Sequence, residues 1–179
     1  AVMDYLRLED ISSDYEFKLC RLDVAVKKVV KKFAPQFIGR HISLHIEQIE
    51  DSVCTDSKWL GFIIEQLISN AVKYSKDGGS VRIYTLHGKG DIKKNSKDDS
   101  LQLVIEDTGI GINEEDIPRI MERGFTGYNG RLDRKSSGIG LYLCRKAADR
   151  LGFVITFDAS YKNGTRVVID MTQRYTKHE

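Results

Sequence analysis

The sequence predicts an α/β domain, because runs of alternating apolar residues recur between segments that have helical spacing. The alternating runs are typical of strands with one buried face, and they cover residues 15–20, 41–49, 80–87, 101–106, 153–159 and 165–171. The longest segment with apolar residues at three- and four-residue spacing covers 55–75. With 179 residues, 41% of them hydrophobic, the chain is long enough for one domain that buries about 70% of its unfolded surface.

Composition excludes several classes of protein. The net charge is only +2 and both signs are interspersed, so we expect no nucleic-acid partner. Cys20, Cys54 and Cys144 are odd in number and lack a C-x-x-C pair, which indicates reduced core thiols rather than disulfides or a zinc site. No apolar run has transmembrane length and residues 1–20 lack a signal-peptide pattern, so we expect a cytoplasmic domain.

The first third of the chain is predicted to alternate between helix and strand. Residues 1–12 have the pattern of a helix end, and 15–20 suit an edge strand. Asp23 is predicted to cap a helix that runs to about Phe33, and Pro35 to end it. In the strand predicted at 41–49, His41 and His45 lie on one side but about 13 Å apart, too far for a shared metal ion.

The helix predicted at 55–75 carries a polar line beside its apolar stripe. Gln66, Asn70 and Lys73 recur at spacings of four and three residues and therefore share one face. Such a line is usually a solvated surface, but Asn70 is a poor helix former set between apolar neighbours. Its amide oxygen suits Mg²⁺, Lys73 can reach a phosphate one turn later, and Tyr74 can lie against a base or ribose.

A strand predicted at 101–106 ends in a carboxylate and two glycines. Asp107 is placed to accept hydrogen bonds at the floor of a pocket, and Gly109 and Gly111 allow a flat group to approach the backbone. The alternative is an ordinary turn after a strand, which Asp-Thr-Gly also suits.

A second glycine pair, Gly138 and Gly140, opens an amphipathic helix with Ile139, Leu143, Ala147 and Leu151 on one face. Unpaired N–H groups at such a helix start favour phosphate.

Three connections complete the sequence-based prediction. Asn113 is predicted to cap a short helix, after which residues 123–137 combine glycines and arginines in a lid anchored by Phe125. The charged segment 88–99 is expected to be a flexible hairpin loop, and Asn163-Gly164 a hairpin turn.

Four of these segments together resemble a known family. EQLISNAVKYS, EDTGIGI, MERGFTGYNG and SSGIGLYL are similar to the asparagine, first glycine, phenylalanine and second glycine boxes of the catalytic ATP-binding domain of bacterial sensor histidine kinases. They occur in the family's order and spacing over residues 60–145. The phenylalanine box and the segment FKLCRLDVAVKKVVKKFAPQF resemble the kinases of low-GC Gram-positive bacteria that sense antimicrobial peptides with an ABC transporter.

The resemblance implies an α/β (α+β) two-layer sandwich, with a mixed, mostly antiparallel sheet and helices on one face (the Bergerat or GHKL fold). It implies a catalytic ATP-binding domain at 13–179 with a lid at 113–137. Residues 1–12 would be the end of a dimerisation-hairpin helix. No histidine precedes His41, so the phosphoacceptor histidine is expected on an upstream hairpin absent from this chain.

The resemblance also assigns roles to single residues. It implies that Asn70 and Gln66 serve Mg²⁺, that Lys73 contacts phosphate, and that Asp107 reads the adenine amino group. The remaining positions implied to contact nucleotide are Tyr74 beside it, Gly109 and Gly111 beneath the base, Phe125 and Thr126 in the lid, and Gly138, Ile139, Gly140 and Leu141 around the phosphates. Arg123 and Arg131 are possible γ-phosphate partners. Related ATPases carry a water-activating glutamate where this chain has Gln66, which cannot take a proton, so hydrolysis should be poor.

The expected function is Mg²⁺-ATP binding and transfer of the γ-phosphoryl group to that histidine, for relay to a response regulator. The full-length protein is expected to be a homodimer in the bacterial cell membrane and this fragment a monomer, and the resemblance implies an ABC transporter as a partner of the full-length sensor. A non-catalytic nucleotide-sensing domain is an alternative, which the complete boxes argue against. A chaperone or mismatch-repair ATPase is another, which Gln66 argues against. P-loop and Rossmann sites are excluded, because no Lys-Ser/Thr follows the second glycine pair and residue 143 is not glycine.

Overall fold

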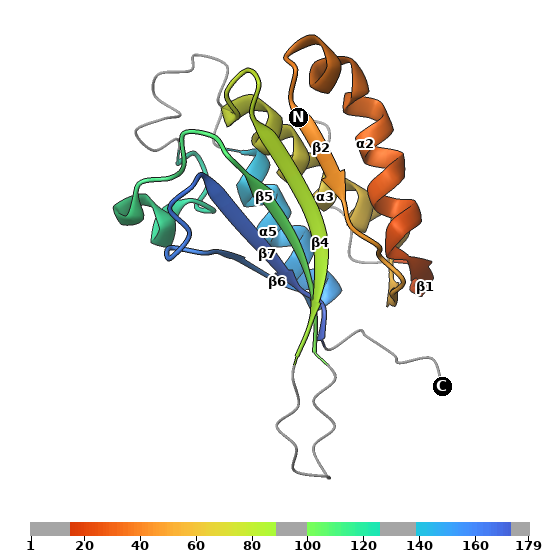
Figure 1. The fold of residues 1–179 in the computed structure, drawn as a ribbon. Coiled ribbons are helices and arrows are strands. Elements are labelled where there is room, and N and C mark those ends of the chain that lie inside the picture. The colour runs from red at the N-terminus through yellow and green to blue at the C-terminus, as the bar shows by residue number, and fades with distance from the viewer. Residues whose placement is uncertain (1–14, 89–99, 126–138, 173–179) are drawn as a thin grey trace.

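The computed structural model describes residues 15–88, 100–125 and 139–172, and one of its two layers is a five-stranded sheet (Figure 1). The strands, in spatial order, are β2 (Ser43–Ile46), β4 (Ser80–His87), β5 (Leu101–Asp107), β7 (Thr165–Asp170) and β6 (Val154–Phe157). Only β2 and β4 pair in parallel; the other three pairings are antiparallel. The alternating apolar residues of β5 face the core, as the sequence predicts.

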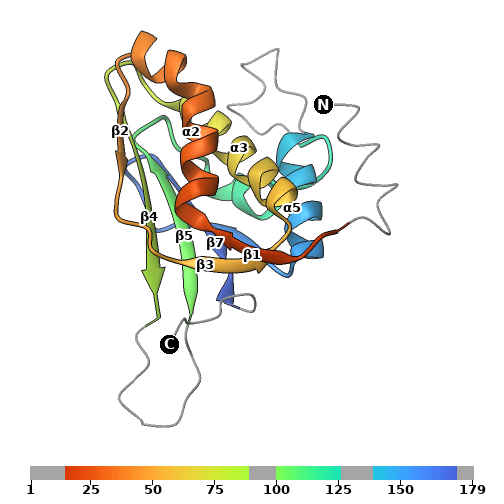
Figure 2. The same cartoon turned by 90° about the vertical axis from the view of Figure 1, so that its right-hand side faces the viewer.

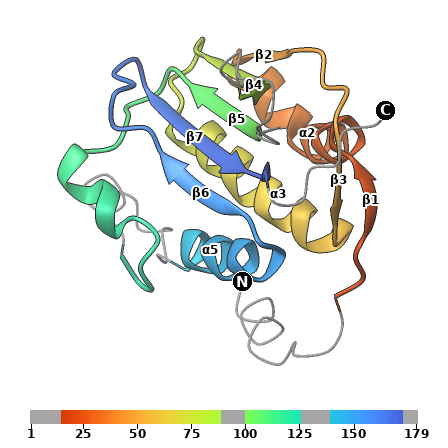
Figure 3. The same cartoon turned by 90° about the horizontal axis from the view of Figure 1, so that it is seen from below.

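Three helices cover one face of this sheet (Figure 3). They are α2 (Leu22–Gly39), α3 (Ser57–Tyr74) and α5 (Gly140–Leu151). Helix α3 is central, since it packs against both α2 and α5 and buries eight residues of its apolar stripe. The predicted two-layer sandwich with a mostly antiparallel sheet and helices on one face is therefore confirmed. None of the helices in the described ranges is both long and apolar enough to cross a membrane.

A second, two-stranded sheet lies beside the helices (Figure 2). Strand β1 (Lys18–Arg21) matches the predicted edge strand, but its partner β3 (Ser52–Thr55) was missed, because Thr55 was assigned to the helix. Helix α3 begins later, at Ser57, because Asp56 caps it. The Asp56 carboxylate accepts bonds from the N–H groups of Lys58 at 2.9 Å and Trp59 at 3.1 Å.

Helix α2 is longer than the sequence predicts. It begins at Leu22, so that Asp23 lies in its first turn instead of capping it, and it continues through Pro35 to Gly39. A proline removes one helical hydrogen bond, but Phe37 beyond it is buried in the core, and this packing keeps the last turn in place.

His41 is also corrected, because it occupies a turn and not a strand. Its φ of 54° is left-handed, which is uncommon for a residue other than glycine. Strand β2 therefore starts only at Ser43, after the chain has reversed direction.

Smaller elements differ in detail from the prediction. Asn113 makes no side-chain capping bond, and the segment after it is the 3₁₀ helix η1 (Glu114–Arg119). Helix α5 begins at Gly140, the second glycine of the predicted pair. The predicted pairing of the last two strands is confirmed as β6 with β7. All three cysteines are free, although Cys54 is only half-buried. The helix end at 1–12, the loop core at 89–99 and the lid at 126–137 lie outside the described residues.

On the sheet face away from the helices, polar side chains form a hydrogen-bonded network. The Tyr84 hydroxyl donates to the buried Glu106 carboxylate, which also accepts from Arg166 Nε at 2.8 Å. Arg166 Nη1 donates to Asp158 at 3.0 Å. Burial, together with the bond to Glu106, raises the pKa of Tyr84 to about 12, so the phenol stays a donor at neutral pH.

Replacing Asp56 with Ala is expected to lower the free energy of unfolding by about 1–3 kcal/mol. The change removes the two capping bonds of α3. It also removes the hydrogen bond that Asp56 accepts from the N–H of Glu16 at 2.9 Å. Urea denaturation measures the loss. Glu115→Ala, an exposed acid in η1, is the matched control and should stay within about 0.5 kcal/mol of the unchanged protein. Equal stability of the two variants would contradict the assigned cap.

Candidate functional site

The polar line on α3 is only partly exposed. Gln66, Asn70 and Lys73 are all half-buried on the flank of a helix whose apolar stripe is fully packed. Lys73 Nζ lies 5.2 Å from the centre of the Tyr74 ring, so both side chains occupy the same side of the last turn. Gln66 also lies close to Gly140 at the start of α5, so this end of the line is set against a second element.

Asp107 is buried at the end of β5, between Val81 of β4 and Thr165 of β7. Its Oδ1 accepts hydrogen bonds from Gly109 N–H at 2.8 Å and Thr165 N–H at 3.3 Å. Burial raises the pKa of the carboxyl group to about 6, and the two backbone donors oppose this shift only in part. The carboxylate is thus held rigidly in a site that penalises its charge, which favours a partner able to donate to it.

The loop after Asp107 is packed directly on the end of α3. Ile110 N–H donates to the carbonyl of Tyr74 at 3.1 Å. A Cβ added to Gly109 would lie 2.2 Å from that carbonyl oxygen, so only glycine fits. Gly111 has a φ of 75°, which other residues rarely adopt. The Ile110 hydrogen bond and the close approach of Gly109 to the Tyr74 carbonyl bring the predicted asparagine and first glycine segments together.

The second glycine segment meets the same helix. A Cβ on Gly140 would lie 2.6 Å from Oε1 of Gln66, so the start of α5 touches the polar line of α3. Ile139, Gly140 and Leu141 are half-buried there, and no side chain caps the helix start. The N-terminus of a helix favours an anion, because its first N–H groups have no partner within the helix.

The lid is described only at its beginning. Phe125 is half-buried, its N–H donates to Glu122 at 3.2 Å, and the Arg119 guanidinium lies 4.8 Å from the ring centre. Arg123 is exposed. The other lid candidates, Thr126 and Arg131, and also Gly138, lie outside the described residues.

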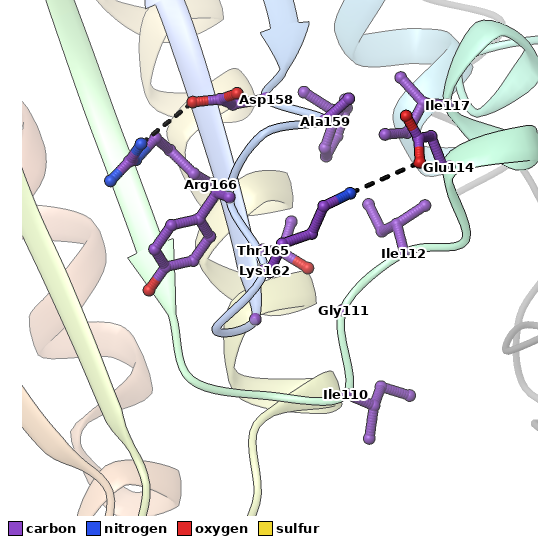
Figure 4. Close-up of a pocket in the computed structure, with 13 residues that line it drawn as sticks. Ile110, Gly111, Ile112, Glu114, Ile117, Asp158, Ala159, Lys162, Thr165 and Arg166 are labelled. Atoms are coloured by element: carbon purple, nitrogen blue, oxygen red, sulfur yellow. Dashed lines mark hydrogen bonds and ion pairs between the residues drawn. The ribbon is translucent and has the colours of Figure 1, made fainter.

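A groove of about 120 Å³ adjoins the first glycine loop (Figure 4). Its described walls are the segment from Ile110 to Ile117 and the loop between β6 and β7. The charged groups drawn there already have partners: Lys162 pairs with Glu114 at 3.5 Å and Arg166 with Asp158 at 3.0 Å. The groove shares Gly111 and Thr165 with the site but not the polar line of α3, so we treat it as a neighbour of the site.

Among the described residues, no cluster of three His, Cys, Asp or Glu side chains offers a ready-made metal centre. The amide oxygens of Asn70 and Gln66 are hard donors on one side of α3. A cation held by only two neutral oxygens needs further oxygen ligands, which phosphates can supply. The donor set therefore fits Mg²⁺ that arrives with a nucleotide better than a permanently bound ion.

Residues 55–174 match the family model for the histidine kinase-, DNA gyrase B- and HSP90-like ATPases. The chain belongs to this family. The matched range holds the polar line of α3, both glycine segments and the beginning of the lid. The resemblance to the ATP-binding domain of sensor histidine kinases is thus confirmed.

Two relatives of this ATPase-family domain are named as sensor proteins. The chain is 35% identical over 159 residues to sensor protein BceS of Bacillus subtilis, covering 89% of this chain and 45% of BceS. It is 38% identical over 120 residues to sensor protein kinase GraS of Staphylococcus aureus, covering 67% of this chain and 32% of GraS. The chain therefore spans less than half the length of these relatives.

Solved structures support the fold. The mycobacterial sensor histidine kinase MprB superposes with a TM-score of 0.71 at 21% identity, covering 90% of this chain and all of that one. The catalytic domain of histidine kinase ThkA gives 0.69 at 19% identity, covering 88% of this chain and 95% of the other. At such low identity the likeness shows that the ATPase-family domain shares their architecture.

Sequence reasoning missed several residues that shape the site. Thr165 donates its N–H to Asp107, and Thr108 Oγ1 accepts from Ser80 N–H at 2.9 Å, which ties the loop to β4. Gly164, interpreted only as a turn residue, leaves no room for a Cβ, which would lie 1.9 Å from the Asp107 carbonyl oxygen. The Asn-Gly pair signalled a turn, but only the strand register places that turn against Asp107.

Replacing Gly109 with Ala is expected to weaken nucleotide binding at least tenfold and to lower the free energy of unfolding by about 1–3 kcal/mol, because the new methyl group overlaps a backbone carbonyl. Gly61→Ala is the control: Gly61 lies within α3, and a Cβ added there would have nothing within 4 Å. It should leave binding unchanged and raise stability by about 0.5–1 kcal/mol. Calorimetric titration and urea denaturation measure both effects, and unchanged binding by Gly109→Ala would contradict the packing described.

Adenosine binding should weaken as the pH falls below about 6, by about tenfold per pH unit, because protonation removes the acceptor that Asp107 offers. Adenosine is used because it has no phosphates to titrate. Between about pH 4 and 6 the folded domain holds a proton that the unfolded chain releases, so this group lowers folding stability as the pH rises.

NMR titrations with adenosine between pH 5 and 8 provide the measurement for this pH dependence. Asp107→Asn should bind weakly with a flat profile. A flat profile for the unchanged protein would remove Asp107 from the base-binding role.

Proposed function

We propose that this chain is the kinase domain of a two-component sensor histidine kinase, which binds Mg²⁺-ATP and passes its γ-phosphoryl group to a histidine on another domain of the same protein. The observation that carries the proposal is the contact between the first glycine loop and the end of α3. It sets Asp107, which is suited to reading a base, beside a helix turn that carries Asn70 and Lys73, which are suited to phosphate and metal.

Base choice follows from the chemistry of Asp107. An ionised carboxylate only accepts hydrogen bonds, so it matches the exocyclic amino group of adenine and opposes the carbonyl oxygen that guanine carries there. Unpaired acceptors in a buried site cost about 1–3 kcal/mol, or about 5- to 150-fold in affinity. ATP should therefore be preferred to GTP by that order.

Phosphate and metal binding are assigned to three segments. Lys73 is a cation within one turn of Asn70 on α3, and the N-terminal turn of α5, which begins at Gly140, lies next to Gln66. We assign Mg²⁺ to the amide oxygens of Asn70 and Gln66, with the phosphates completing its oxygen ligands. Bound there, the ion would neutralise charge on the transferred phosphoryl group, and Lys73 and the α5 N–H groups would add to this stabilisation.

Gln66 bears on whether the phosphoryl group passes to water or to another acceptor. The resemblance places this glutamine where related ATPases carry a water-activating acid, and an amide cannot accept a proton from water at neutral pH. Glu65 is adjacent, but its carboxylate is turned away and pairs with Lys32 at 2.6 Å. The site therefore favours transfer to an incoming nucleophile over rapid hydrolysis.

The proposed partners follow from the same assignment. They are the protein's own dimerisation and phosphoacceptor hairpin and a response regulator that receives the phosphoryl group. The complete protein is proposed to be a homodimeric sensor in the cell membrane; the relatives BceS and GraS, both named as sensor proteins, support the sensor role alone. An ABC transporter acting with this sensor is part of the proposal, on the strength of the resemblance described above.

The test compares this domain with a longer chain that includes the upstream hairpin. The domain should bind Mg²⁺-ATP in preference to GTP by calorimetry, release phosphate slowly, and remain unlabelled by γ-labelled ATP, whereas the longer chain should acquire an acid-labile phosphohistidine. Asn70→Ala should abolish the Mg²⁺-dependent part of ATP affinity, and Ser69→Ala, its neighbour off the polar line, should not. Brisk hydrolysis, or no ATP binding, would overturn the proposal.

A further inference from the structure

Arg40, at the end of α2, is bound to the last turn of α3. Its Nη1 donates to the carbonyl of Val72, and its Nη2 donates to the carbonyl of Ser75 at 2.5 Å. Its Nε pairs with Asp77 at 2.8 Å, which orients the guanidinium plane. The planar fork of arginine suits this double contact, because its donors are fixed relative to one another. One side chain therefore brackets Lys73 and Tyr74, the two residues between its acceptors.

The helix end needs such a partner. The last four carbonyls of a helix have no partner within it and carry partial negative charge. In α3 the carbonyl of Ala71 accepts from Ser75, while those of Val72 and Tyr74 accept from Arg40 and Ile110, which are distant in sequence. Arg40 thus satisfies one of these acceptors and places a positive charge at a helix end that would otherwise repel an anionic ligand.

The contact also reaches the first glycine loop. Ile110 N–H is bound to the Tyr74 carbonyl at 3.1 Å, and the same oxygen would meet a Cβ on Gly109. A small movement of the last turn of α3 therefore moves the loop as well. The backbone supports the same connection, because the Arg40 carbonyl accepts from Gly78 N–H at 3.0 Å just beyond the helix.

We infer that Arg40 is a positioning residue for the nucleotide site. It fixes the last turn of α3 so that Lys73 faces the phosphates and the Tyr74 carbonyl holds the first glycine loop beneath the base. The inference rests on the proposed function, since it concerns the same ATP site, but it assigns a role to a side chain that contacts no nucleotide. The alternative is that Arg40 only stabilises the fold.

The two roles are separated by comparing Arg40→Ala with Arg21→Ala. Arg21 lies at the other end of α2, where its guanidinium pairs with Asp23 at 2.7 Å. At a temperature where denaturation curves show both variants to be folded, Arg40→Ala should weaken Mg²⁺-ATP binding about 2- to 30-fold, the range of indirect coupling, and Arg21→Ala should not change it. Arg40→Lys keeps the charge without the fork and should fall between.

Hydrogen exchange of the Ile110 amide gives a second readout, which reports on the local contact when global stability is held equal. It should be faster in Arg40→Ala than in Arg21→Ala when global stability is matched with urea, because the acceptor at Tyr74 is no longer fixed. Unchanged ATP affinity with unchanged Ile110 exchange would overturn the inference. Should Arg40→Ala fail to fold, Arg40→Lys carries the test by the same two criteria.

Failure of the inference remains distinct from failure of the proposed function. If the unchanged domain does not bind Mg²⁺-ATP, the function is wrong, and with it the role of Arg40 at a nucleotide site. If the unchanged domain binds Mg²⁺-ATP and Arg40→Ala binds it equally well with unchanged exchange, the function stands and only the role of Arg40 is wrong.

Discussion

The site depends on the contact between the first glycine loop and the carbonyl end of α3. Gly109 approaches the Tyr74 carbonyl more closely than any side chain would permit, and the N–H of Ile110 closes the contact with a hydrogen bond. This single junction joins the strand that carries Asp107 to the helix that carries Asn70 and Lys73. Because a helix and a sheet otherwise pack through interchangeable apolar side chains, the junction is what fixes their register at the level of single atoms.

Burial of Asp107 costs the fold stability at neutral pH, where the carboxyl group is charged. An aspartate with its pKa raised to about 6 is held where its charge is disfavoured, and its two backbone donors only partly compensate. By contrast, the equally buried Glu106 of the same strand is paired with Tyr84 and Arg166. The difference between these neighbours supports the proposal that Asp107 binds a ligand, since a structural acid would be paired with a cation as Glu106 is.

Much of this site could be predicted from the sequence because its parts are local patterns. The spacing of Gln66, Asn70 and Lys73 places them on one helix face whatever surrounds them, and Asp-Thr-Gly after an alternating run predicts a turn at a strand end. Periodicity also gave the strands of the main sheet. It failed at two places: Pro35 does not end α2 because Phe37 is buried beyond it, and β3 was missed because Thr55 was assigned to the helix that follows.

Contacts between distant segments could not be predicted in this way. Arg40 follows a helix and precedes a turn, and nothing near it in the sequence distinguishes it from a solvated arginine. Its acceptors lie 32 and 35 residues further along the chain, and they are backbone carbonyls, which every residue type provides. Gly164 is similar, since only the pairing of β5 with β7 brings it to Asp107. The side chains that would touch nucleotide are therefore visible in the sequence, whereas the residues that hold them in place become visible only in the fold.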